Sequence, residues 1–285
     1  MVPQVVLFLS YLCIGVVLSV NVPLTMLTDS KAKCLDGTQS GFYYQQARSV
    51  ENQNKWVINL NGGGECDTES ACVAQTKSSL GSSKYFYNQS DAAYWYLASD
   101  NCAANPDLCN WNHVLNPYCT QDLHSGMVET ASNETYGLYF AGFFVMESIL
   151  NSLDKAENSI LSATDIIVHG VSAGGIGVWM VVDYIAKRYP KARVVAAPLA
   201  GHYFYATYYA GENHTSPSGM GDFRAQAWEH TYALYNAYVD EDCKAAYLQK
   251  NLSPGACLLS NNSLPYIQSE VFITQALTDQ VVLTG

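Results

Sequence analysis

Residues 169–180 read HGVSAGGIGVWM and place one serine, Ser172, within a run of small residues. The stretch DIIVH before it, residues 165–169, is short and apolar, which is typical of a buried strand. After it, apolar residues recur at i, i+3, i+4 and i+7, which predicts a helix from Gly174 to Tyr189. The apolar positions of this helix are Val178, Val181, Val182 and Ile185. A strand is therefore expected to turn sharply into a helix at Ser172.

Residues 170–174 of this stretch match the pattern Gly-x-Ser-x-Gly. Small neighbours let the strand and the helix approach closely while the serine occupies a strained turn. The hydroxyl would then stand at a helix N-terminus, where developing negative charge is stabilised. The pattern predicts Ser172 as a nucleophile. The alternative is a glycine-rich turn that serves packing only.

A second glycine run, NGGGEC, occupies residues 61–66 and directly follows the apolar stretch WVINL, residues 56–60. Glycines can aim successive backbone N–H groups at one point without Cβ clashes. We expect Gly63, Gly64 and the N–H of Ala173 to form an oxyanion hole. A phosphate-binding loop is disfavoured because the Lys-Ser/Thr that should follow is missing. A simple tight turn is the other alternative.

The remaining pattern predicts an α/β fold in which a mostly parallel sheet carries helices on both faces, as in α/β-hydrolases. Strands are expected at residues 192–198 and 270–276, and helices at residues 135–153 and 223–239. No internal repeat or low-complexity linker interrupts the pattern. Residues 21–285 are therefore expected to form a single domain.

The N-terminal segment, residues 1–20, is apolar and has the length of a signal peptide. A short membrane anchor is the alternative. The formal charge of −11 argues against nucleic acid as a partner, because like charges repel. After removal of the signal no stable insertion into a membrane is expected, and we expect a secreted, extracellular protein.

Cysteine usage agrees with export, since Cys13 lies in the expected signal and eight cysteines remain. Short separations favour three disulfides and leave a fourth pair. The expected pairs are Cys66 with Cys72, Cys102 with Cys109, Cys243 with Cys257, and Cys34 with Cys119. A zinc site is the alternative, but neither Cys-x-x-Cys nor a neighbouring histidine cluster is present. Predicted N-glycosylation sequons begin at Asn88, Asn133, Asn213, Asn251 and Asn261.

Four stretches together resemble the pectin acetylesterase family of secreted α/β-hydrolases, which includes plant pectin acetylesterases and the animal carboxylesterase Notum. They are LNGGGEC, NPYCTQD, GVSAGGIGVWM and QALTDQ, and the resemblance extends from Lys33 to the end of the chain. It implies Ser172 as nucleophile, Asp279 as triad acid, and Gly63, Gly64 and Ala173 as oxyanion donors. It also supports the Cys66–Cys72 and Cys34–Cys119 pairings, and it implies a supporting hydrogen-bond role for Asp122.

The activity implied by the resemblance is that of a serine carboxylesterase without a cofactor or metal. Acetyl esters of cell-wall polysaccharide are the expected substrate, and a Notum-like role on a lipidated protein is the alternative. A serine peptidase or acyltransferase on the same scaffold would use the same nucleophile. Two departures bear on this expectation.

The first departure is Glu65, which stands where family members usually carry a tryptophan. Its carboxylate either changes the substrate preference or points to solvent. The second is the absence of a histidine after Asp279, although hydrolases of this type need one as a base. The histidines of the chain are His113, His124, His169, His202, His214 and His230. Of these, His124 and His202 are the least unsuitable substitutes.

We expect the chain to be a fragment of a longer protein whose base histidine lies in a later segment. The alternative is a catalytically inactive, secreted binding protein on the same fold.

Overall fold

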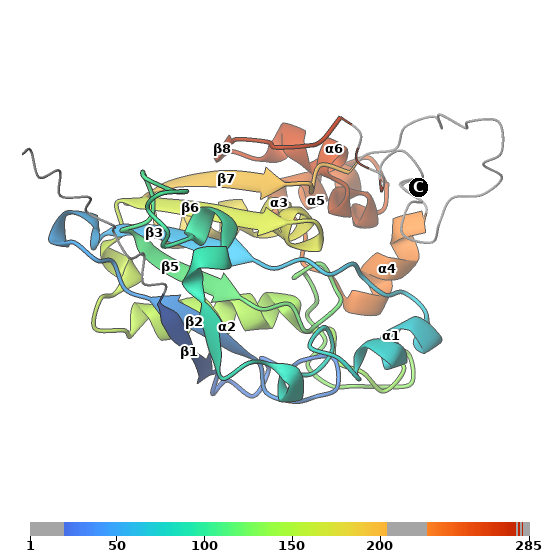
Figure 1. The fold of residues 1–285 in the computed structure, drawn as a ribbon. Coiled ribbons are helices and arrows are strands. Elements are labelled where there is room, and N and C mark those ends of the chain that lie inside the picture. Colours follow the sequence, from blue (N-terminus) through green and yellow to red (C-terminus); the bar gives the residue numbers. More distant parts are fainter. Residues whose placement is uncertain (1–19, 204–226, 278, 280, 282–285) are drawn as a thin grey trace, which may run out of the picture.

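A central sheet organises the computed structural model, which describes residues 20–203, 227–277, 279 and 281 (Figure 1). Its eight strands, within the described residues, follow the order β4-β1-β2-β5-β3-β6-β7-β8. Their bounds are β1 (Asn21–Met26), β2 (Gly41–Gln45), β3 (Lys55–Leu60), β4 (Gln89–Asp91), β5 (Asn112–Asn116), β6 (Asp165–Val171), β7 (Arg193–Leu199) and β8 (Glu270–Val271). The pairs from β5 to β8 are parallel, and those from β4 to β5 are antiparallel. The predicted α/β class is confirmed.

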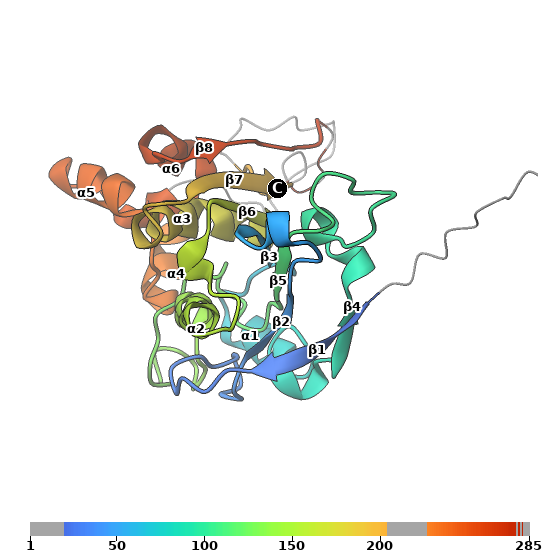
Figure 2. The same cartoon turned by 90° about the vertical axis from the view of Figure 1, so that its left-hand side faces the viewer.

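Helices cover both faces of this sheet (Figure 2). The α-helices are α1 (Glu69–Gln75), α2 (Gly142–Asp154), α3 (Ala173–Arg188), α4 (Ala227–Tyr235), α5 (Glu241–Gln249) and α6 (Ser260–Ser263). α2 and α3 pack in the core on one face, and the short 3₁₀ helices η3 (Ala92–Tyr94) and η4 (Tyr96–Ala98) contribute Ala92 and Ala98 to the core on the other. The central strands are thus buried on both sides.

β3 shows why its sequence is apolar without alternation. Trp56 and Ile58 belong to the core shared with α2 and α3, whereas Val57 belongs to the second core together with Trp95 and Leu115. Side chains alternate between the faces of a strand, so a strand covered on both faces needs apolar residues at successive positions. Each fully buried side chain of this size contributes roughly 1.5–3 kcal/mol.

The predicted strands at residues 56–60, 165–169 and 192–198 are confirmed as β3, β6 and β7, and the helix from residue 174 is confirmed as α3. The helix predicted over residues 135–153 starts only at Gly142. Tyr136 and Gly137 have φ values of 58° and 71°, so this stretch is a left-handed turn that a helix cannot include. The apolar spacing there serves loop packing instead.

Two later predictions are also too long. The strand expected over residues 270–276 is regular only in β8, followed by an isolated bridge between Leu199 and Thr274. The helix expected over residues 223–239 is α4, which ends at Tyr235 because Asn236 turns the chain with a φ of 46°. Residues 223–226 of that prediction lie outside the described residues.

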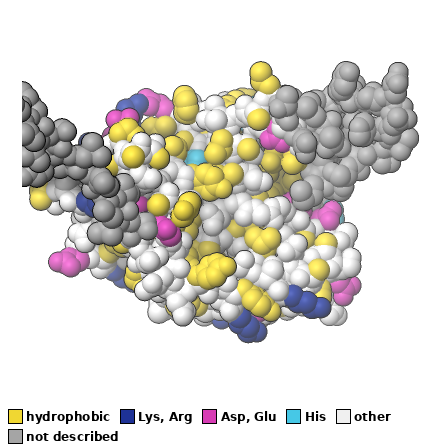
Figure 3. Space-filling view, in the orientation of Figure 1, with side chains coloured by type: hydrophobic (Ala, Val, Ile, Leu, Met, Phe, Trp, Pro, Cys, Tyr) yellow, Lys and Arg dark blue, Asp and Glu magenta, His cyan; other side chains and the backbone are white. Residues whose placement is uncertain are grey.

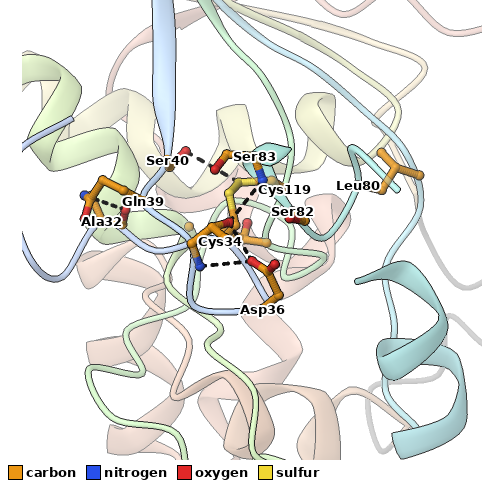
Figure 4. Close-up of a disulfide and its surroundings, with 12 residues drawn as sticks. Ala32, Cys34, Asp36, Gln39, Ser40, Leu80, Ser82, Ser83 and Cys119 are labelled. Atoms are coloured by element: carbon orange, nitrogen blue, oxygen red, sulfur yellow. Dashed lines mark hydrogen bonds between the residues drawn. A yellow bond between two sulfur atoms is a disulfide. The ribbon is translucent and has the colours of Figure 1, made fainter. Parts of the chain in front are cut away.

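All four predicted disulfides are present, so the zinc alternative for these cysteines is wrong. Cys34 and Cys119 join the loop before β2 to the loop after β5 across 85 residues (Figure 4). The N–H of Leu35 donates to the carbonyl of Cys119 at 2.8 Å beside this bond. The loop after β5 is thereby fixed where it continues toward the site.

Residues 1–19, with Cys13 and most of the expected signal, and the sequon at Asn213 lie outside the described residues. The other four sequon asparagines are exposed, as attachment of a glycan requires. Their glycosylation and the division into residues 1–20 and 21–285 stay predictions. Within the part of the chain that is described, the helices are too short or too polar to cross a membrane.

Candidate active site

Ser172 occupies the turn between β6 and α3 with φ 56° and ψ −122°. Residues other than glycine avoid this region of φ and ψ, and holding one there costs about 1–3 kcal/mol. The turn is fixed from both sides: the N–H of Ser172 donates to the carbonyl of Leu199 at 3.0 Å, and its carbonyl accepts from the N–H of Ile176 at 3.0 Å. The side chain is therefore presented beyond the carboxyl end of β6.

The glycine run after β3 lies directly against this turn. A Cβ atom on Gly62 would come within 2.2 Å of the carbonyl oxygen of Val171 and 3.0 Å of the Cβ of Ser172. A Cβ on Gly174 would come within 2.0 Å of the carbonyl oxygen of Leu60. β3 and β6 are parallel neighbours with Leu60 opposite Gly170, so both loops leave the same edge of the sheet. Only glycine permits this contact.

A small pocket of about 30 Å³ opens beside Ser172. Its walls are mostly apolar, and it brings the serine together with two of the predicted oxyanion donors. The lining residues are Gly64, Glu65, Leu123, Ser172, Ala173, Ile176, Tyr203, Trp228 and Val281. Gly63 is not among them, and its carbonyl accepts a hydrogen bond from Nε2 of Gln121 at 3.1 Å.

Glu65 forms part of the pocket wall and does not point into bulk solvent. The hydroxyl of Tyr235 lies 3.2 Å from Oε2 of Glu65 and 2.7 Å from the carbonyl oxygen of Cys66. Burial, together with the neighbouring charge of Asp67, raises the pKa of Glu65 to about 7, and the Tyr235 contact works in the opposite direction. The pocket can thus hold this group neutral or charged near neutral pH.

Asp122 is completely buried and does not border the pocket. It accepts hydrogen bonds from the Thr120 hydroxyl at 2.5 Å, from the N–H of Gly142 at 2.7 Å and from the N–H of His124 at 3.1 Å. Burial raises its pKa to about 6 against these bonds. The carboxylate of Asp122 thus lies beside Gly142, the first residue of α2, where the positive end of the helix dipole stabilises a negative charge. Asp122 therefore acts on the site only through the loop that it holds.

His124, one of the two substitute bases considered above, is also enclosed. Its Nε2 lies 2.8 Å from the carbonyl oxygen of Asn61, and Nδ2 of Asn116 lies 3.4 Å from its Nδ1. Burial lowers the pKa of His124 to about 4. Both ring nitrogens are engaged in the interior, which argues against His124 as the substitute base.

Three other histidines also lie in structural positions. His113 bonds the carbonyl of Leu108 through Nε2, and His169 bonds the carbonyl of Ala197 through Nδ1. Burial lowers the pKa of both rings. His230 is exposed at the start of α4, with its Nε2 3.1 Å from the carbonyl of Asp67.

Asp279 and Ser172 both interact with Tyr203. Its Oδ2 accepts from Nε2 of Gln275 at 2.7 Å, and its Oδ1 accepts from the N–H of Val281 at 2.9 Å. Burial raises the pKa of Tyr203, a hydrogen bond with Ser172 lowers it, and the charge of Asp279 raises it. Oε1 of the same Gln275 accepts from the N–H of His202 at 3.1 Å. Gln275 thus links Asp279 to the backbone of His202.

This sheet, with a strained serine at the turn from a central parallel strand into a helix, defines the α/β-hydrolase class of fold. A family model described as pectinacetylesterase matches residues 17–285, and the chain belongs to that family.

Curated relatives agree with the family assignment. Pectin acetylesterase 4 of Arabidopsis thaliana is 29% identical over 255 residues, which are 88% of this chain and 58% of the relative. Palmitoleoyl-protein carboxylesterase NOTUM of Schmidtea mediterranea is 30% identical over 164 residues, which are 57% of this chain and 30% of the relative. The chain thus spans little more than half the length of the plant relatives that it matches.

Among solved structures, the Wnt deacylase Notum from Drosophila superposes with a TM-score of 0.76 at 21% identity. The match covers 90% of this chain and 71% of that one. At this level of identity the similarity establishes the fold.

Proposed function

We propose that this chain carries the site of an exported serine carboxylesterase that removes acetyl groups from polysaccharide. The observation that carries the proposal is the strained turn at Ser172, which shares one small pocket with Gly64 and Ala173. Membership of the pectinacetylesterase family supports the reaction class. The four disulfides support export, because such bonds persist in oxidising compartments.

In the proposed reaction the Ser172 oxygen bonds to the ester carbonyl carbon while its proton passes to a base. The N–H groups of Gly64 and Ala173 stabilise the negative charge on the carbonyl oxygen. The bond from the carbonyl carbon to the sugar oxygen breaks, and the base returns its proton to that oxygen. Water then attacks the acetyl-serine, releases acetate and restores the hydroxyl. The proposal assigns the base to a histidine outside the described residues, oriented by Asp279.

The size of the pocket supports an acetyl group over a long acyl chain. A cavity needs about 10–15 Å³ to hold one water molecule, so about 30 Å³ accommodates roughly two groups of that size. The methyl and carbonyl carbons of an acetyl ester match this volume. A fatty acyl chain has several times more carbon atoms, which disfavours the lipid-ester alternative.

A fluorophosphonate probe on the complete protein tests the nucleophile. Peptide mapping should find the label on Ser172, and Ser172→Ala should lose the label and about 10³-fold of the turnover of p-nitrophenyl acetate. His202→Ala tests the substitute base and should keep most of the turnover, because the proposed base lies elsewhere. A folded wild-type protein without label and without turnover would overturn the proposal in favour of an inactive binding protein.

A chain-length series tests the acyl group. The rate should fall from p-nitrophenyl acetate to butyrate and octanoate, and acetylated polysaccharide should release acetate. A preference for octanoate would instead favour the lipid-ester alternative.

A further inference from the structure

A second and larger cavity opens on the other side of Ser172. This cleft, which we call the aromatic cleft, has a volume of about 580 Å³. It meets the small pocket at Ser172 and is bounded there by the start of the glycine run. Its lining residues are Asn61, Gly62, Tyr87, Gln89, Ser90, Asp91, Tyr94, Trp95, Tyr96, Leu115, Val171 and Ser172. An ester whose acyl group fills the small pocket would place its alcohol part in this cleft.

Three tyrosines of the aromatic cleft are unusually exposed. Tyr87, Tyr94 and Tyr96 have 81%, 80% and 54% of their surface accessible. Grouped exposed apolar surface of this kind marks ligand-binding grooves, and aromatic rings combine a flat apolar face with a polar hydroxyl. Sugar rings have the complementary form, because their C–H bonds gather on one face and their hydroxyls project from the edge.

These tyrosines are mounted on a rigid support. The hydroxyl of Tyr43 donates to the carbonyl of Tyr87 at 2.7 Å. Trp95, only 3% exposed, donates through Nε1 to the hydroxyl of Ser90 at 2.9 Å. Tyr96 follows with a left-handed φ of 55°, so the chain turns at this residue. A preformed aromatic surface loses little conformational entropy when it binds a ligand.

The charge of the aromatic cleft restricts the ligand. Of its lining residues, all of them described, none is lysine or arginine, and Asp91 contributes a carboxylate. Oδ1 of Asp91 accepts from the N–H of Ala93 at 3.0 Å. On the face shown in Figure 3, hydrophobic side chains are spread among uncharged polar surface, and Lys and Arg lie toward its edges. An ionised uronate would meet negative potential without a compensating cation.

We propose that the aromatic cleft binds uncharged sugar rings of the substrate chain, neutral or methyl-esterified, by stacking on Tyr87 and Tyr94. This inference rests on the proposed function, because it takes the sugar to be the alcohol part of the ester. It adds that the preferred polysaccharide is not an ionised galacturonan.

Calorimetric titration of the complete Ser172→Ala protein tests the proposal without turnover. Xylohexaose and methyl-esterified hexagalacturonate should bind, and de-esterified hexagalacturonate should bind at least about tenfold more weakly. Tyr87→Ala and Tyr94→Ala, each made in the Ser172→Ala protein, should each weaken binding about five- to tenfold. Tyr85→Ala is the matched control, because Tyr85 is 52% exposed but does not line the cleft. Equal weakening by Tyr85→Ala, or tighter binding of the ionised sugar, overturns the proposal.

The same variants separate this inference from the proposed function. In the protein that keeps Ser172, Tyr94→Ala should raise KM for acetylated xylan by a larger factor than KM for p-nitrophenyl acetate, and Tyr85→Ala should change neither. Sugar binding without any ester turnover would contradict the proposed esterase activity but not the proposed sugar binding in the aromatic cleft. Turnover of p-nitrophenyl acetate without sugar binding would contradict the cleft and leave the esterase.

The sequon at Asn88 adjoins the aromatic cleft, so a glycan on that residue is the competing occupant. Asn88→Gln should leave the affinity for xylohexaose within about twofold. Binding that emerges only in Asn88→Gln would mean that the chain's own glycan fills the cleft, and the proposal would be wrong.

Discussion

Nε2 of His124 lies 2.8 Å from the carbonyl oxygen of Asn61, the first residue of the glycine run. With Nδ1 facing the amide of Asn116, the neutral ring donates from Nε2 and accepts at Nδ1. Holding this carbonyl fixes the direction of the peptide units that follow, including the one that carries the N–H of Gly64. His124 thus positions the proposed oxyanion hole from behind.

Replacement of this ring tests that role. His124→Phe keeps the aromatic packing against Tyr118, whose ring centre lies 4.6 Å away, but leaves the carbonyl of Asn61 without its donor. We expect a loss of about 1–3 kcal/mol in the free energy of unfolding and a lower kcat. The pKa values in the pH profile of kcat/KM should not change, because the ring stays neutral above a pKa of about 4. Loss of the low-pH limb of that profile, where a catalytic base becomes protonated, would instead identify His124 as the base.

Gly62→Ala tests the contact between the two loops. The added Cβ would lie 2.2 Å from the carbonyl oxygen of Val171, so the loop must move away from Ser172. We expect at least a hundredfold loss of turnover of p-nitrophenyl acetate. Gly137→Ala is the control: its φ is 71°, but nothing lies within 4 Å of an added Cβ. It should cost about 1–2 kcal/mol of stability and leave turnover intact. Equal losses in both variants would contradict the contact.

The sequence was sufficient for the parts of this site that depend on local pattern. β3, β6 and α3 have apolar repeats that match their periods, and the glycines at 62 and 174 lie where backbones touch. The disulfides followed from cysteine spacing and the family resemblance. Each of these features is determined within a few residues of the chain.

Features set by distant contacts could not be predicted in the same way. Asp122 belongs to a recognisable motif, but its partner Gly142 lies 20 residues on, and only the folded chain shows that it caps α2. β1 and β2 pair with each other although their sequences show no strong alternation of apolar residues. Tyr87 and Tyr94 are exposed, and nothing in the sequence distinguishes them from the many other tyrosines. The aromatic cleft therefore became visible only in the structure.

Disulfide removal offers a matched comparison. Cys66–Cys72 and Cys102–Cys109 close loops with separations of 6 and 7 residues, so each should contribute about 2 kcal/mol to stability. Only the first begins at the end of the glycine run, next to Glu65. Double replacement by serine should reduce turnover of p-nitrophenyl acetate for Cys66–Cys72 but not for Cys102–Cys109. Similar kinetics of the two variants would show that the first bond does not position the loop.

Glu65 should make stability depend on pH. Its pKa rises from 4.5 to about 7 on folding, so the folded chain binds more protons than the unfolded chain between these values. The contribution of Glu65 is fully present below pH 4.5 and is lost as the pH rises through about 7. Because the side chain is only half-buried, we expect a loss of about 1–2 kcal/mol. Glu65→Gln should remove this loss.

Urea denaturation of wild type and Glu65→Gln between pH 4.5 and 8 measures the effect. Other buried groups, such as Asp122 and His113, titrate in both proteins and cancel in the difference. The free energy of unfolding of Glu65→Gln, relative to that of the wild type, should increase as the pH rises. Parallel curves would show that the carboxyl of Glu65 is solvated in the folded chain.

Ile176 limits the small pocket from the first turn of α3 and is 5% exposed. Ile176→Val removes one methylene group and gives the acyl chain the corresponding space. Since one buried methylene is worth about 0.8 kcal/mol, the ratio of kcat/KM for p-nitrophenyl propionate over acetate should rise about fourfold. Ile185→Val removes a methylene group from the same helix but away from the pocket. It should lower the free energy of unfolding by about 0.5–1.5 kcal/mol, as Ile176→Val does, without changing this ratio. If both variants keep the wild-type ratio, the acyl group binds elsewhere and the acetyl-sized pocket does not set the specificity.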